Sequence, residues 1–276
     1  MRPCLPVFRH LLFPAAALCC AFLLALALLL QGCMPRGEVG PAPPELSPRQ
    51  VWDRFWSRQR GLDSHPASSI RGSLNIFTPE RSHRLTFRLW GNHPLPFRLR
   101  LRAGLGTTLS MWEVRREGVL VYFPQKNRAY VRKDTRRALA DTGLNLPLSL
   151  EEMRTVLASD WRQLLWRDYG EAKRLPGQGF AFFSSQEARI QRVVLDRKAR
   201  LVSLSGSGPG KWRMRRKDFS TRLGRLLSRR LEVETGQEQE LILRIKDFRL
   251  RQGPWPEADL RISLPGDTIK KSPFPR

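Results

Sequence analysis

Residues able to support catalysis or metal binding are few in this chain. Beyond the N-terminal region there are three histidines, His65, His83 and His93. None has a histidine or carboxylate partner at the i, i+4 spacing that helical metal sites use. Residues 206–211 are similar to a phosphate-binding loop, but the glycine spacing differs and Trp212 replaces the required Ser or Thr. With no Gly-x-Ser-x-Gly motif either, we expect no enzyme, no metal and no cofactor.

Cysteine chemistry is confined to the N-terminus. Cys4, Cys19, Cys20 and Cys33 are the four cysteines, so a disulfide framework or a cysteine metal site downstream is excluded. A basic start and an apolar run over residues 11–30 are typical of a secretory signal. The residues before Cys33, Leu-Gln-Gly, resemble a bacterial lipobox, which predicts a signal over 1–32 and lipidation of Cys33. The run could also span a bilayer as an uncleaved anchor.

The charge is strongly positive, with 49 Lys and Arg against 25 Asp and Glu, or +24. Loss of the signal leaves 47 basic residues against the same 25 acidic ones, or +22. Outside the cytoplasm this charge favours anionic head groups over nucleic acid, although a solubilising surface is the alternative. In lipoproteins that this chain resembles, Met34 after the cysteine indicates the outer membrane. We expect a basic surface comprising Arg213, Arg215, Arg216 and Lys217, which either lies on lipid head groups or is simply solvated. In the first case Trp212 would lie at the membrane interface.

These features need a scaffold, and its first elements are a tether and a helix. Residues 33–48 contain the lipidated cysteine and a Pro-rich tether. Ser47 and Gln50 form a capping-box pattern that starts a helix. Its apolar stripe, which includes Trp52 and Trp56, favours core packing over a membrane-facing role.

Strands dominate the rest of the chain. In residues 97–103, apolar side chains alternate with arginines, and Gly104 and Gly106 flank Leu105 before a second strand. Short links between successive strands predict an antiparallel meander. Helices are expected over 133–141, after Ser149 and over 160–169, and they should cover the concave face of the sheet. Strands resume from Phe180 and run to 264, and residues 265–276 are a loose tail.

The motifs in this order resemble the outer-membrane lipoprotein receptor family, the LolB-like proteins, and more distantly their periplasmic LolA-like carrier relatives. The matching segments are Arg71-Gly72, Phe87-x-Leu-Trp90, residues 104–108, Tyr130 and residues 143–148. The resemblance implies an α+β fold over residues 49–264. It would be an antiparallel half-open β-barrel of about eleven strands with helices covering the concave face.

The resemblance also implies a function. Such proteins take lipoprotein acyl chains from a LolA-like carrier and insert them into the outer membrane, and Gly104, Leu105 and Gly106 match the loop that engages the membrane. We expect a lipid-anchored monomer at the periplasmic face, contacting outer-membrane lipids. An adaptor lipoprotein whose basic surface binds envelope lipids, polymers or a protein is the alternative. Residues that line an acyl cavity, or simply form a closed core, are Phe87, Leu89, Phe97, Leu99, Leu101, Trp161, Trp166, Phe180 and Phe182.

Overall fold

A computed structural model describes residues 46–60, 67–104, 106–177, 179–208, 210–236 and 238–271. The predicted signal over 1–32, Cys33 and most of the tether lie outside these ranges, and so does Leu105. Residues from Leu46 onward form one compact unit. Among the described residues, no helix is both long and apolar enough to cross a membrane.

The unit is built on one sheet of fourteen strands in the order β14-β6-β5-β4-β3-β2-β1-β13-β12-β11-β10-β9-β8-β7. Only the β14–β6 pair is parallel among the pairs described. The strands are β1 (Ala67–Phe77), β2 (Ser82–Asn92), β3 (Phe97–Ala103), β4 (Thr108–Arg115), β5 (Gly118–Phe123), β6 (Arg128–Arg132), β7 (Glu171–Leu175), β8 (Gly179–Phe183), β9 (Ile190–Leu195), β10 (Leu201–Gly206), β11 (Trp212–Arg222), β12 (Arg225–Thr235), β13 (Glu240–Arg251) and β14 (Ile269–Lys271).

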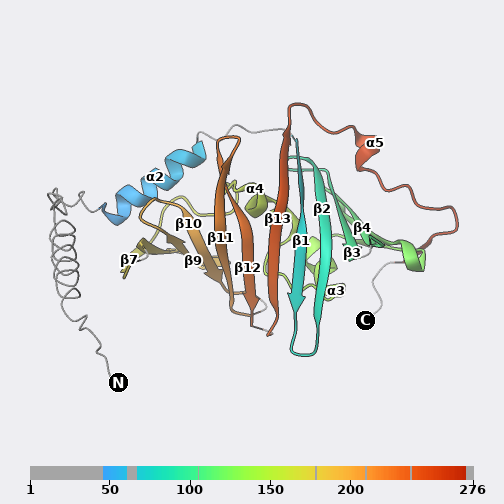
Figure 1. Ribbon diagram of the computed structural model, residues 1–276, viewed down its shortest axis with the longest axis horizontal. Helices are drawn as coiled ribbons and strands as arrows, with labels where there is room; N and C mark the ends of the chain where they lie inside the picture. The colour runs from blue at the N-terminus through green and yellow to red at the C-terminus, as the bar shows by residue number, and fades with distance from the viewer. Residues whose placement is uncertain are drawn as a thin grey trace, which may run out of the picture. The chain divides into compact units, whose positions relative to one another are not determined.

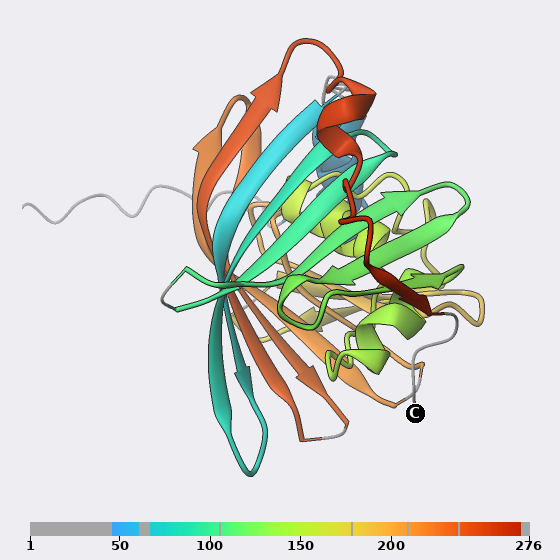
Figure 2. The same ribbon diagram turned by 90° about the vertical axis from the view of Figure 1, so that its right-hand side faces the viewer.

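Pairing of β1 with β13 joins the two halves of the chain, because β1 also pairs with β2 and β13 with β12. The sheet is open and strongly curved (Figures 1 and 2). The predicted α+β half-open fold is confirmed, although the strands number fourteen rather than about eleven.

Helices lie at the ends and inside the curve of the sheet. They are α2 (Pro48–Arg60), α3 (Thr135–Asp141), α4 (Leu150–Ala158) and the short α5 (Glu257–Leu260), with a 3-10 turn η1 (Pro124–Lys126). Figure 2 shows α4 on the concave side. Both predicted capping boxes form: Ser47 with Gln50 before α2, and Ser149 with Glu152 before α4.

The α2 stripe packs into the core as predicted. Trp52 is 1% exposed, and its ring lies 5.1 Å from Trp166 and 4.7 Å from Phe182 between centroids. Its indole N–H donates to the Arg167 carbonyl at 2.8 Å. Aromatic contact at this density fixes α2 against the sheet.

Three local predictions are wrong. Residues 160–169 form turns rather than a helix, although the Leu165 amide still bonds the Trp161 carbonyl at 3.0 Å. Residues 261–264 are not a strand, and within the expected loose tail β14 pairs with β6.

Candidate functional site

The predicted cavity residues belong to a closed core. Eight of the nine are buried, with exposures from 0 to 7%, and Trp166 is half-buried against the same cluster. Of the nine, Trp161 alone also lines one of the pockets described below. Of the two alternatives for these positions, the packing favours the closed core, because buried residues of α2 and α4 belong to the same cluster.

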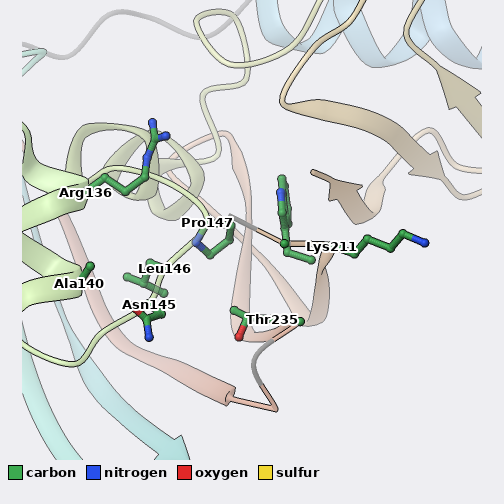
Figure 3. Close-up of a pocket in the computed structure, with 10 residues that line it drawn as sticks. Arg136, Ala140, Asn145, Leu146, Pro147, Lys211 and Thr235 are labelled. Carbon is green, nitrogen blue, oxygen red and sulfur yellow. The ribbon is translucent and has the colours of Figure 1, made fainter. Parts of the chain in front are cut away.

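An apolar pocket does occur at one end of the sheet, with a volume of about 130 Å³. It lies beneath residues 143–148, which join α3 to α4 and are called the lid segment below. Figure 3 shows Leu146 and Pro147 between α3, which carries Ala140, and the strand end with Thr235, while Lys211 points away. The pocket residues are Arg136, Ala140, Asn145, Leu146, Pro147, Gly210, Lys211, Trp212, Thr235 and Gly236. We call this site the lid pocket.

The floor of the lid pocket is continuous with the core. Trp212 is 4% exposed and belongs to the core cluster, and Leu146 packs against that cluster while half-buried. The indole N–H of Trp212 has no acceptor among the described residues. A buried donor without a partner is costly, so a ligand carbonyl reaching this indole would be stabilised.

Several hydrogen bonds hold the lid segment, among them those from the Gly143 amide to the Ala140 carbonyl at 2.9 Å and from the Leu144 amide to the Leu139 carbonyl at 3.0 Å. The Gln239 side-chain amide donates to the Gly143 carbonyl at 3.2 Å, and the Leu146 amide bonds the Leu144 carbonyl at 2.8 Å. Leu144 and Leu148 anchor the segment in the core at 6 and 0% exposure. The lid segment is thus anchored in the core at both ends.

The prediction that four basic residues form an exposed surface is correct for only some of them. Arg213 and Lys217 are exposed, and Arg215 is half-buried beside Glu232 and Glu234. Arg216 is 4% exposed and faces the interior, so its place on that surface is wrong. The alternation of β11 explains the error, since even-numbered side chains from Trp212 to Arg216 point inward. For the same reason Trp212 is not an interfacial residue.

The predicted membrane loop joins β3 to β4. Gly106 has a positive φ of 89°, and its amide bonds the Ala103 carbonyl at 2.9 Å. Arg102 also braces the loop by donating from Nε to the Gly106 carbonyl at 2.8 Å. Leu105 itself lies outside the described residues, as does Cys33, so the roles of both remain predictions.

Sequence reasoning missed Arg154 on α4, which is 1% exposed. Its guanidinium donates to the Gly91 carbonyl at 2.9 Å and the Pro94 carbonyl at 3.0 Å, and it also bonds Asn92. Burial lowers its pKa to about 10. An arginine on the apolar side of a predicted helix was the available signal. Arg154 locks α4 to the β2–β3 connection.

The histidines and acidic residues that the structure describes do not gather into a metal site. No group of three or more His, Cys, Asp or Glu residues among them could hold a metal ion. His83 is exposed, and burial together with Arg154 lowers the pKa of the half-buried His93. His65 lies outside the described ranges.

Comparisons with solved structures identify the fold. A domain described as an outer membrane lipoprotein-sorting protein domain from Vibrio parahaemolyticus matches with a TM-score of 0.52 and 11% identity, over 76% of this chain and 95% of that chain. A LolA superfamily protein from Nitrosomonas europaea matches with a TM-score of 0.50 and 10% identity, over 79% of this chain and 98% of that chain. The chain has the LolA superfamily fold.

The LolA/LolB-like resemblance predicted from the motifs is thereby confirmed at the level of fold. No protein-family model matches the sequence, and no curated protein is similar to it.

Proposed function

We propose that this protein binds acyl chains of lipoproteins, or of other envelope lipids, in the lid pocket and helps insert lipoproteins into the outer membrane. The observation that carries the proposal is the apolar pocket whose floor is the core and whose roof is the lid segment. In this proposal the protein is a non-enzymatic carrier, anchored through Cys33 at the periplasmic face, that receives its cargo from a LolA-like carrier.

The size of the lid pocket points to a gated site. Its 130 Å³ lies below the roughly 300–1,000 Å³ typical of ligand pockets. An acyl chain gains about 0.8 kcal/mol per buried methylene, so a chain of ten methylenes offers about 8 kcal/mol. That gain exceeds the cost of breaking the Gln239–Gly143 hydrogen bond together with the backbone bonds of Gly143, Leu144 and Leu146, at about 0.5–1.5 kcal/mol each. Cargo can therefore drive the lid open and extend the pocket toward the core.

The test is acyl occupancy of the full-length protein, measured by native mass spectrometry after titration with a fatty acid. Ala140 is exposed at the mouth of the pocket, so Ala140→Trp should fill it and reduce occupancy at least tenfold. Ala140→Ser at the same position is the matched control and should bind like the parent. Equal occupancy in Ala140→Trp and the parent would refute the lid pocket as the acyl site.

Delivery to the membrane is tested separately. Leu105→Glu should leave fractionation and folding unchanged but abolish lipoprotein transfer, because the loop no longer enters the bilayer. Val131→Glu, at an apolar side chain that is 51% exposed on β6, is the control. Normal transfer by Leu105→Glu would remove Leu105 from the mechanism without affecting the acyl site.

An adaptor role is the second candidate, favoured by the outer face of the sheet. There the guanidinium carbons of Arg88, Arg98 and Arg100 lie 4.9, 5.1 and 5.7 Å from the Trp90 ring centre. Burial lowers the pKa of Arg88 and of Arg98, and the crowding of like charges adds to the effect. Such a cluster fits an anionic polymer, and an adaptor would bind it equally well when Ala140→Trp blocks the pocket.

A further inference from the structure

A second cavity, of about 490 Å³, lies at the opposite end of the β11–β12 hairpin from the lid pocket. Its walls come from α2, the end of α4, the β9–β10 connection and the tip of the hairpin, and Figure 1 shows α2 beside that tip. Five of the lining residues are basic, and no Asp or Glu is among the lining residues of the described structure. The basic residues are Arg58, Lys198, Arg200, Arg216 and Arg225.

Arg216 is the least compensated of these cations. Its Nη1 donates to the Leu201 carbonyl at 3.1 Å, and Nη2 donates to the Ser159 hydroxyl at 2.8 Å and the Leu226 carbonyl at 3.3 Å. Its Nε has no acceptor and no carboxylate pairs with it among the described residues. Burial lowers the pKa of Arg216 to about 9. A buried cation held by neutral acceptors alone is costly, and an anion in the cavity would offset that cost.

Carbonyl oxygens of the backbone position two of the other cations. Arg58 donates to the Lys198 carbonyl at 2.7 Å, and Arg225 donates to the Ala158 carbonyl at 3.3 Å. Arg200 does have a carboxylate partner, Asp196, at 2.5 Å. With Asp196 pairing Arg200 and no Asp or Glu among the lining residues, Arg58, Lys198 and Arg216 leave the cavity with a positive potential.

The hairpin tip beside the cavity carries an unexpected leucine. Leu223 and Gly224 have φ values of 51° and 69°, and Arg222 pairs with Arg225 across the turn. A two-residue turn with both φ values positive favours Asn-Gly, because a bulky side chain is disfavoured in that conformation. Leu223 is nevertheless present and is 63% exposed. An apolar side chain kept at such a tip fits contact with a bilayer better than contact with water.

We propose that this cavity binds the phosphate of an anionic phospholipid head group, with Leu223 inserted in the same leaflet. Its volume is within the range of ligand pockets, and its charged lining fits a phosphate rather than an acyl chain. Arginine guanidinium groups bind phosphate oxygens in a bidentate manner. The site is independent of the lid pocket, so either can fail without the other.

The test uses full-length protein in nanodiscs made of phosphatidylcholine alone or with phosphatidylglycerol, with the unfolding temperature as the readout. A ligand that binds only the folded state raises that temperature. We expect a rise of about 3 °C or more in phosphatidylglycerol nanodiscs. Arg58→Gln should lose most of the rise, and Lys198→Gln is the second variant should Arg58→Gln fold poorly. Arg54→Gln removes the same charge from an exposed position on the same helix and should keep the rise.

Two further measurements distinguish binding of a lipid head group from binding of free phosphate. Leu223→Asn suits the turn and should fold well, yet it should reduce the rise in phosphatidylglycerol nanodiscs. Inorganic phosphate at constant ionic strength should give a smaller rise that Leu223→Asn leaves unchanged. Equal effects of Arg58→Gln, Lys198→Gln and Arg54→Gln would overturn the cavity as the site. A full rise with inorganic phosphate alone, unaffected by Leu223→Asn, would overturn the membrane assignment.

Discussion

Replacing Gly72 by alanine should strain the seam that joins the two halves of the sheet. Gly72 lies at a register shift between β1 and β13. A Cβ there would lie 2.3 Å from the Arg244 carbonyl oxygen and 2.7 Å from the Phe87 ring. The ring could rotate away, but the carbonyl belongs to the backbone of β13. Relief therefore requires β1 and β13 to move apart locally.

Overpacking of this kind costs about 1–3 kcal/mol, and a backbone clash belongs at the upper end of that range. Replacing glycine by alanine also lowers the entropy of the unfolded state, which stabilises the folded protein by about 0.4–1 kcal/mol. The net expectation for Gly72→Ala is a loss of about 2 kcal/mol, or a fall of about 4–8 °C in the unfolding temperature. Urea unfolding followed by circular dichroism should show a lower midpoint with an unchanged m-value.

Gly253→Ala is the matched control, because no atom lies within 4 Å of a Cβ placed there. It should be neutral or slightly stabilising. A Gly72→Ala protein within about 0.5 kcal/mol of the parent would show that the seam tolerates separation, and the steric argument would fail.

Two more substitutions test the packing and electrostatics. Trp52→Ala should lower the free energy of unfolding by about 3–5 kcal/mol without weakening vesicle binding, because the side chain is buried in the core. Weaker vesicle binding with unchanged stability would instead indicate a membrane-facing helix. Burial alone would raise the pKa of Glu232, but hydrogen bonds from Lys217 and Arg215 outweigh it and lower the pKa. Glu232→Gln should thus cost about 1–2 kcal/mol at pH 7, and the difference in stability from the parent should shrink as the pH falls below the ordinary glutamate pKa and acid protonates Glu232. A pH-independent difference between the two proteins would contradict this assignment.

Alternation and capping signals determined much of the fold from the sequence alone. The pattern in residues 97–103 specified both the strand and its buried face, since a strand with one apolar side can be buried in only one way. Ser149 and Glu152 likewise specified the start of α4 because the capping box is a local interaction. The motifs were sufficient to predict the LolA-like architecture.

Only the tertiary structure decided which apolar faces remain open and which charges are buried. The nine predicted cavity residues have the same sequence pattern whether they line a groove or a core, and the packing of α2 and α4 closes them into a core. Arg216 was predicted on an exposed basic surface, but in β11 it shares the inward face with Trp212 and Met214. Composition sets the total charge, whereas strand register determines which arginine faces a cavity. The lid pocket and the second cavity, which Arg216 faces, both depend on contacts between segments distant in sequence. The local sequence pattern therefore could not reveal them.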